Sequence, residues 1–232
     1  MSIPLIWHLA NRHGNSPRLA RQLLLKVFRQ WIQPTDKQRV YITADREFVG
    51  PEFRQCGLIP VIRLRANALI KTPQGSSRRV STLFDTPHWR LLRKPRRLYK
   101  QDLYLAGKRL ADGDFLIVYS LVYLPRIAQL YGQRWGIETL FGAYKSRGFD
   151  LEECRITAHH RLRTLLFVLS MGLIWALETG LWLVAKGVAI PVRIVQVSRQ
   201  VYSLFRHGLD ELRDRCLNQR SIQDLIPLLS CL

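Results

Sequence analysis

The sequence predicts an α/β protein in which helices flank a mixed sheet. Apolar runs rich in β-branched and aromatic residues, bounded by charged or turn residues, are typical of buried strands. Three such runs cover residues 39–45, 58–64 and 114–120. Elsewhere apolar residues recur at every third or fourth position, which indicates amphipathic helices. With 232 residues, the chain is long enough to bury one substantial core and to carry a smaller appended module.

The chain is strongly basic. It contains 36 Lys and Arg against 17 Asp and Glu, a formal net charge of +19. An excess of this size favours a polyanionic partner, and arginine clusters such as Arg96-Arg97 make nucleic acid the leading one. A membrane surface is the weaker alternative. Charge alone predicts phosphate binding and says nothing about phosphate cleavage.

The first 65 residues predict alternating strands and helices. Residues 1–7 are interpreted as the end of a strand, and residues 19–31 as an amphipathic helix ending near Pro34. The strand over residues 39–45 places Asp45 at its C-terminal end, where open α/β sheets carry their chemistry, although such an Asp is often only a cap. A short helix over residues 51–55 follows.

The strand predicted over residues 58–64 contains Pro60 and Arg63, which suggest an exposed or edge position. Residues 66–113 then change character, with dense arginine clusters and short alternating runs. This pattern predicts a β-rich basic insertion made of hairpins. Its turns are expected at the glycines Gly75, Gly107 and Gly113.

The strand over residues 114–120 leads to a helix predicted over residues 130–145. A helix turns about 100° per residue, so Tyr131, Arg134, Glu138 and Lys145 fall within a sector of roughly 60°. They form one polar stripe. The alternative is an ordinary i,i+4 ion pair on a solvated face. An apolar flank for burial is expected beside the stripe, formed by Leu130, Ile137 and Phe141.

The last part of the chain is predicted to be helical. Residues 165–177 carry no charge and Glu178 follows them, so a buried core helix is favoured over a membrane span. Residues 203–212 are interpreted as a helix pair that closes the domain. The four cysteines lie far apart without a Cys-x-x-Cys pair, and no signal peptide is evident, which together indicate reduced thiols in a cytoplasmic protein.

The spacing Tyr131-x2-Arg134-x3-Glu138-x6-Lys145 resembles the signature of DDE-type insertion-sequence transposases of the insertion-sequence-four-like group. Residues 44–48 resemble the second catalytic block of that group, with Glu47 where glycine is more usual. The resemblance implies an RNase H-like core over residues 1–65 and 114–232. It also implies that the insertion over residues 66–113 touches DNA.

The resemblance further assigns roles to individual residues. Asp45 and Glu138 would be catalytic and would hold Mg²⁺ or Mn²⁺, the hard cations that prefer carboxylate oxygens. Tyr131, Arg134 and Lys145 would bind the DNA backbone, and Arg96 and Arg97 would bind it from the insertion. The implied partner is double-stranded DNA at insertion-sequence ends, with a second copy or a full-length transposase as a further partner.

The family also uses an earlier Asp on the first strand of the sheet. Residues 1–35 contain no Asp or Glu, and the first acid, Asp36, lies in a polar turn close to Asp45. The first strands are therefore expected to be missing and cleavage to be impaired. Three hypotheses follow: a defective transposase fragment, a non-enzymatic DNA-binding or inhibitory derivative, and a small membrane protein centred on residues 164–190.

Overall fold

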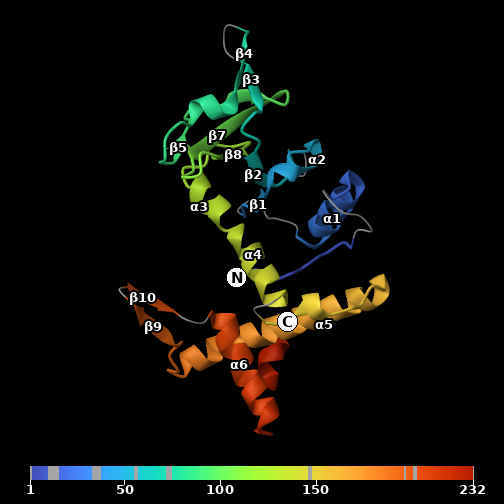
Figure 1. Cartoon of the computed structure of the whole chain (residues 1–232). Helices are drawn as coiled ribbons and strands as arrows, with labels where there is room; N and C mark the ends of the chain where they lie inside the picture. Colours follow the sequence, from blue (N-terminus) through green and yellow to red (C-terminus); the bar gives the residue numbers. More distant parts are fainter. Residues whose placement is uncertain are drawn as a thin grey trace. The chain divides into compact units, whose positions relative to one another are not determined.

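The computed structural model describes residues 2–9, 16–32, 38–54, 57–71, 75–145, 148–195, 197–200 and 203–231. The chain forms two compact units (Figure 1). One unit comprises Ala10–Trp135 and is called the sheet unit below. The other comprises Met1–Leu9 and Gly136–Leu232 and is called the helical unit.

The sheet unit is built on a mixed sheet, which confirms the predicted α/β class. Its strands follow the order β1-β2-β8-β7-β5, and β6 pairs with β7 beside this path. Only β1 and β2 are parallel, and the other pairs are antiparallel. The bounds are Tyr41–Ala44 (β1), Ile59–Leu64 (β2), Arg90–Leu91 (β5), Arg96–Leu98 (β6), Gln101–Arg109 (β7) and Phe115–Ser120 (β8).

Strand β2 is a central strand, so the prediction of an exposed or edge position was wrong. It pairs with β1 on one side and with β8 on the other. Pro60 is tolerated because pairing with β8 begins only at Ile62, while Ile59 N donates to Val40 O on the β1 side. The missing N–H of Pro60 therefore removes no hydrogen bond of the ladder.

Side chains alternate between the two faces of the sheet, and each face is covered. On one face Ile117 and Tyr119 join a core that includes Leu25 of α1 (Arg18–Trp31). On the other face Val118 packs with Tyr131 of α3 (Ile127–Gly132). The 3₁₀ helix η1 (Arg46–Phe48) and α2 (Pro51–Arg54) connect β1 to β2.

The predicted β-rich segment lies inside the sheet unit, and β7 belongs to the main sheet. A small hairpin of β3 (Leu69–Lys71) and β4 (Ser77–Arg79) precedes the 3₁₀ helix η2 (Val80–Leu83). Gly75 and Gly113 have positive φ, as turn glycines do. Gly107, however, lies within β7, so its predicted place in a turn was wrong.

The helical unit contains α5 (His159–Ala185), α6 (Leu204–Leu217) and nearly all of α4 (Trp135–Tyr144). Its core joins Leu140 and Tyr144 of α4 to Leu173 of α5 and Leu209 of α6. Shorter elements complete it: η3 (Leu151–Glu153), the hairpin of β9 (Val192–Val195) and β10 (Val197–Gln200), and η4 (Ile226–Cys231). Residues 2–9 form no strand, contrary to the prediction for residues 1–7.

Helix α5 is long and apolar enough to cross a membrane by length and composition, and 33% of its most apolar window is buried inside the protein. One such helix is weak evidence for a membrane span, since core helices of soluble proteins have the same properties. Leu173, Ala176 and Leu183 of α5 are buried, as the core-helix interpretation requires.

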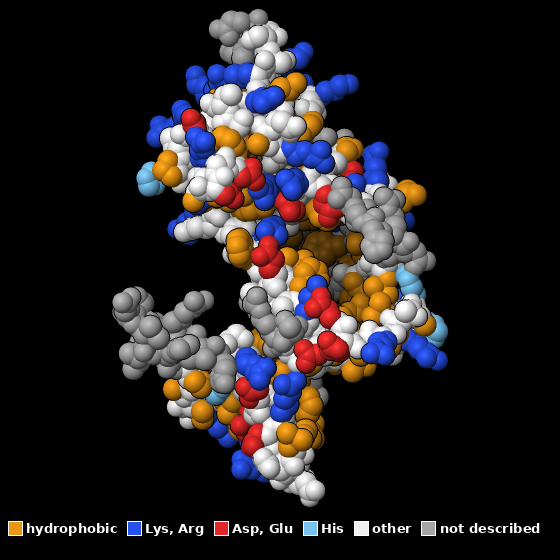
Figure 2. Space-filling model, viewed as in Figure 1, with side chains coloured by type: hydrophobic (Ala, Val, Ile, Leu, Met, Phe, Trp, Pro, Cys, Tyr) orange, Lys and Arg blue, Asp and Glu red, His pale blue; other side chains and the backbone are white. Residues whose placement is uncertain are grey.

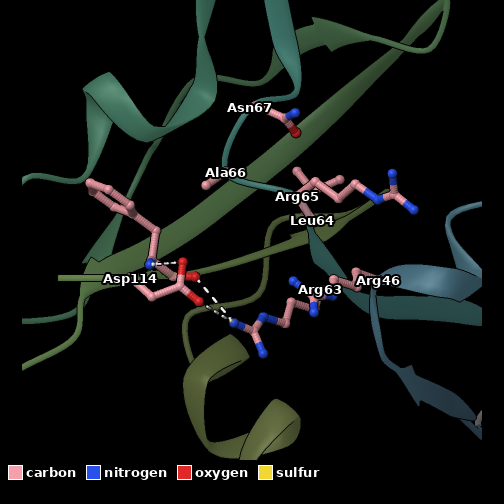
Figure 3. A pocket seen from close by; sticks show the side chains of 8 residues that line it. Arg46, Arg63, Leu64, Arg65, Ala66, Asn67 and Asp114 are labelled. Atoms are coloured by element: carbon pink, nitrogen blue, oxygen red, sulfur yellow. Dashed lines mark hydrogen bonds and ion pairs between the residues drawn. The ribbon is translucent and has the colours of Figure 1, made fainter. Parts of the chain in front are cut away.

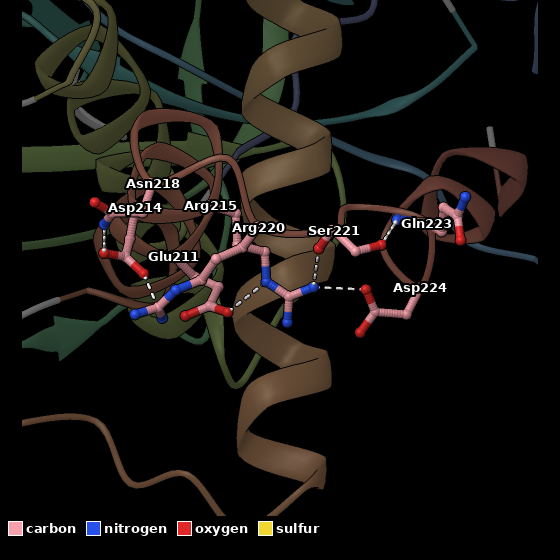
Figure 4. Close-up of polar contacts among 8 residues, drawn as sticks. All are labelled: Glu211, Asp214, Arg215, Asn218, Arg220, Ser221, Gln223 and Asp224. Atoms are coloured by element: carbon pink, nitrogen blue, oxygen red, sulfur yellow. Dashed lines mark hydrogen bonds and ion pairs between the residues drawn. The ribbon is translucent and has the colours of Figure 1, made fainter.

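Arg215 fastens the C-terminal segment to the helices of its unit (Figure 4). Its Nε lies 2.7 Å from Glu211 Oε1, and its Nη1 lies 2.5 Å from Asp224 Oδ1 and donates to Ser221 O. The guanidinium also lies over the ring of Trp182, with Cζ 5.5 Å from the ring centroid. The Arg215 hydrogen bond lowers the pKa of Asp224 below its ordinary value of 3.8.

This contact predicts an acid-sensitive stability difference. Because the pKa of Asp224 is lower in the folded state, its contribution is present above pH 3.8 and is lost as the pH falls through the folded value. We expect Asp224→Asn to be less stable than wild type in urea at pH 6. The difference in the free energy of unfolding should disappear once the pH falls below the folded-state pKa of Asp224. Glu153→Gln, at an exposed position of the same unit, is the control. A difference that persists at low pH would contradict the assignment.

Candidate functional site

Asp45 is the first residue after β1, at the C-terminal end of the parallel pair. Its Oδ1 accepts a hydrogen bond from the backbone N–H of Arg46 at 2.8 Å and caps η1. The capping role considered from the sequence is therefore present. It uses one carboxylate oxygen, and Oδ2 can still serve as a ligand for a cation.

Tyr131 lies near Asp45 because α3 packs against β1, β2 and β8, and Arg134, just after this helix, lies against Tyr131. Tyr131 is only 2% exposed, and the Cζ of Arg134 lies 5.6 Å from its ring centroid. Burial raises the pKa of Tyr131, and the negative charge of Asp45 adds to this effect, while Arg134 and Arg63 oppose it. At neutral pH the phenol therefore remains protonated and can donate a hydrogen bond.

Arg63 also lies near Asp45 and Tyr131, and the sequence interpretation did not include it among the site residues. It lies on the central strand β2, its side chain is 20% exposed, and its Nη2 lies 3.3 Å from Asp114 Oδ2. The sequence signal was a single arginine inside an apolar strand, which was interpreted as a mark of an edge. Together Asp45, Arg63, Tyr131 and Arg134 form what we call the Asp45 cluster, one carboxylate among two guanidinium groups and a phenol.

Glu138 and Lys145 belong to the helical unit. The predicted single helix is interrupted between α3 and α4, where Gln133 N donates to Leu130 O and Arg134 N to Tyr131 O. These i→i+3 bonds form a tight turn in place of a continuous α-helix. Because Glu138 and Asp45 belong to different units, their pairing stays a prediction.

The surroundings of Glu138 also differ from those expected. Ile137 and Phe141, predicted to be buried beside the stripe, are 41% and 52% exposed, and α4 buries Leu140 and Tyr144 in their place. Glu138 itself is exposed. Lys145 Nζ lies 2.7 Å from Glu152 Oε1, and both side chains are more than half exposed, so this ion pair adds little to stability.

The two insertion arginines lie on β6. Arg97 forms an exposed ion pair with Asp102 at 3.4 Å. Arg96 is half-buried, and its Nε has no hydrogen-bond partner among the described residues. Their predicted contact with DNA stays a prediction. Lys and Arg side chains are spread widely over the visible face of the sheet unit (Figure 2).

The described parts of the chain contain no group of three or more His, Cys, Asp or Glu side chains that could hold a metal ion. Asp45 and Glu138 still fit a hard divalent cation by chemistry, because each offers carboxylate oxygens. Cys154 and Cys216 are free thiols, and the other two cysteine side chains lie outside those described.

The mixed sheet with the Asp45 cluster at a strand end defines an α/β domain with a charged cluster at the C-terminal end of its parallel strand pair. Comparison with known families identifies it further: the family described as Transposase DDE domain matches residues 4–175. The chain therefore belongs to the DDE-domain transposases, a family that generally uses a divalent metal and acts on DNA. No curated protein and no solved structure matches this chain.

Proposed function

We propose that this chain binds the ends of an insertion sequence through the Asp45 cluster and the basic face of its sheet unit. The family match supports a role in DNA transposition. The observation that carries the proposal is the convergence of Asp45 with Arg63, Tyr131 and Arg134 at the end of β1. The guanidinium groups and the phenol would hold a backbone phosphate by hydrogen bonds. The carboxylate would bind a cation that contacts the same phosphate.

Asp45 and Glu138 would hold Mg²⁺ or Mn²⁺, which supplies charge stabilisation at the phosphate when bound. Arg134 and Lys145 would position the DNA strand. We propose that residues 66–113 serve as a DNA-contacting module through Arg96 and Arg97, within an RNase H-like core of the insertion-sequence-four-like type. The family also favours a soluble cytoplasmic protein in which α5 is a core helix.

We further propose that a polypeptide of these 232 residues binds DNA and cleaves it poorly. The described residues contain no group of three His, Cys, Asp or Glu side chains that could hold a metal ion, and residues 1–35 contain no acid. A two-metal site needs several converging carboxylates. A non-enzymatic role, in which the chain occupies DNA ends or pairs with a second transposase copy, is the alternative that the same observation favours.

DNA affinity of the purified protein tests this proposal. We expect binding of a labelled duplex to weaken steeply with salt, because phosphate contacts release counterions. The double substitution Arg96→Ala with Arg97→Ala should weaken binding and reduce the salt slope by about 2. A matched control removes Arg161 and Arg163, two exposed residues of α5. If both double variants lose the same amount of DNA affinity, Arg96 and Arg97 on β6 have no specific role in DNA binding.

Cleavage is measured separately on the same duplex with Mg²⁺. We expect no nicking above background. Magnesium-dependent nicking that disappears in Glu138→Gln would contradict the impaired-cleavage proposal and establish an enzyme. Absence of salt-dependent DNA binding would overturn the proposed function as a whole, whereas recovery only in detergent would support the membrane alternative.

A further inference from the structure

A basic pocket of about 550 Å³ lies in the sheet unit. The polar and aromatic side chains that line it come from η1, from β2 and the loop after it, and from the start of β8 (Figure 3). They are Arg46, Arg63, Arg65, Asn67, Asp114 and Phe115. A cavity of this volume can hold a phosphate or a nucleotide-sized group, and it is too small for a duplex.

The charges of this pocket are unbalanced. Three arginines line it, together with a single carboxylate, that of Asp114. Only Arg63 engages it, through Nη2, which also lies 3.4 Å from Phe115 O. The side chains of Arg46 and Arg65 form no ion pair or hydrogen bond with any described residue, and Figure 3 shows the Arg65 guanidinium extending away from Asp114.

Arg46 and Arg65 are exposed, and several positive charges that line one pocket attract an anion. Arginine is suited to this role because its planar fork can donate two parallel hydrogen bonds to a phosphate. The pair between Arg63 and Asp114 is a weak competitor, since Asp114 is 54% exposed. An entering phosphate can therefore take the place of Asp114 at the guanidinium of Arg63.

The pocket adjoins the Asp45 cluster. Arg46 follows Asp45 in the chain, and its backbone N–H is bound to the Asp45 carboxylate. Arg63 belongs to both sites, because it lines the pocket and its charge partly opposes the rise in the pKa of Tyr131 that burial causes. Arg65 is the first residue after β2, and it lines the pocket together with Arg63, while Leu64 between them is buried.

We propose that this pocket binds a backbone phosphate of the DNA. The adjacent phosphate of the same strand would lie at Asp45. The inference rests on the proposed function and assigns to Arg46 and Arg65 a role in positioning the strand. The arginines would fix the register of the strand relative to Asp45, because phosphate contacts set position without reading sequence.

The first experiment measures DNA affinity by fluorescence anisotropy across a salt series. The double substitution Arg46→Ala with Arg65→Ala should weaken binding about tenfold and lower the salt slope by about 2. The control, Arg161→Ala with Arg163→Ala, removes the same charge from exposed positions of α5. If the control loses as much DNA affinity, the pocket does not bind a DNA phosphate, while the proposed function still stands. No DNA binding by wild type would overturn both.

The second experiment uses a substitution expected to increase affinity, so a folding defect cannot imitate it. Asp114→Asn removes the competing charge and keeps an oxygen for the bond from Phe115 N. We expect DNA binding to tighten about two- to fivefold. Inorganic phosphate and pyrophosphate are then titrated as competitors. One outcome would overturn the assignment to a DNA strand. In it, free phosphate binds only when Arg46 and Arg65 are present, but replacing these arginines does not change the affinity for DNA. The ligand would then be a free anion.

Discussion

Replacing Gly208 by leucine is expected to unfold the helical unit. Gly208 lies where α6 crosses α5, and a Cβ atom there would collide with the backbone oxygen of Ala176 and lie 2.5 Å from Gly180 N. Both obstacles are backbone atoms, so no rotamer change can relieve the overlap. The loss should reach about 3 kcal/mol or more, at the upper end of the range for single substitutions.

The tryptophans of α5 report this unfolding. Trp175 donates from Nε1 to Leu225 O, so its fluorescence follows the packing of the C-terminal segment. Urea unfolding monitored at this signal should shift strongly for Gly208→Leu. Gly132→Ala is the control, because nothing lies within 4 Å of its added Cβ and alanine favours helix. Unchanged stability of Gly208→Leu would show that the two helices do not cross as closely as the structure places them.

Glu52→Ala is the second substitution with a large expected effect, and it acts on the sheet unit. The Glu52 side chain is 3% exposed and lies 3.2 Å from Arg21 Nε and 3.5 Å from Arg18 Nε, both on α1. Arg21 is 13% exposed and its guanidinium also lies near the ring of Phe48. Removing the carboxylate leaves Arg21 buried without its counter-charge, which should cost about 3 kcal/mol.

A double substitution distinguishes the pair from simple loss of packing. Arg21→Met combined with Glu52→Leu removes both charges and keeps apolar volume, so it should recover most of the stability that Glu52→Ala loses. Asp102→Ala breaks the exposed pair with Arg97 and should change stability by about 1 kcal/mol or less. If Glu52→Ala costs no more than Asp102→Ala, the ion pairs do not hold α1 against α2.

The local sequence pattern was sufficient to predict the main strands and the first helix of the sheet unit. The β-branched runs predicted β1, β2 and β8, and the recurrence of leucines predicted the helix of residues 18–31. The strand pattern also placed Asp45 at a strand end, as the structure has it. These features depend on side-chain periodicity and backbone propensity, which the residues of each segment carry by themselves.

Tertiary structure decided the features that involve residues far apart in the chain. Pairing with both β1 and β8 made β2 central, and it turned Arg63 from a supposed edge marker into a neighbour of Tyr131. Packing also selected Leu140 as a buried residue of α4 and left Phe141 exposed.

The sequence alone therefore predicted the shared spacing of Tyr131, Arg134, Glu138 and Lys145 and the strand-end position of Asp45. The tertiary structure decided that Asp45, Arg63, Tyr131 and Arg134 share one site and that a basic pocket adjoins it. The physical reason is that periodicity describes the faces of one element, whereas strand order and helix docking choose which faces meet.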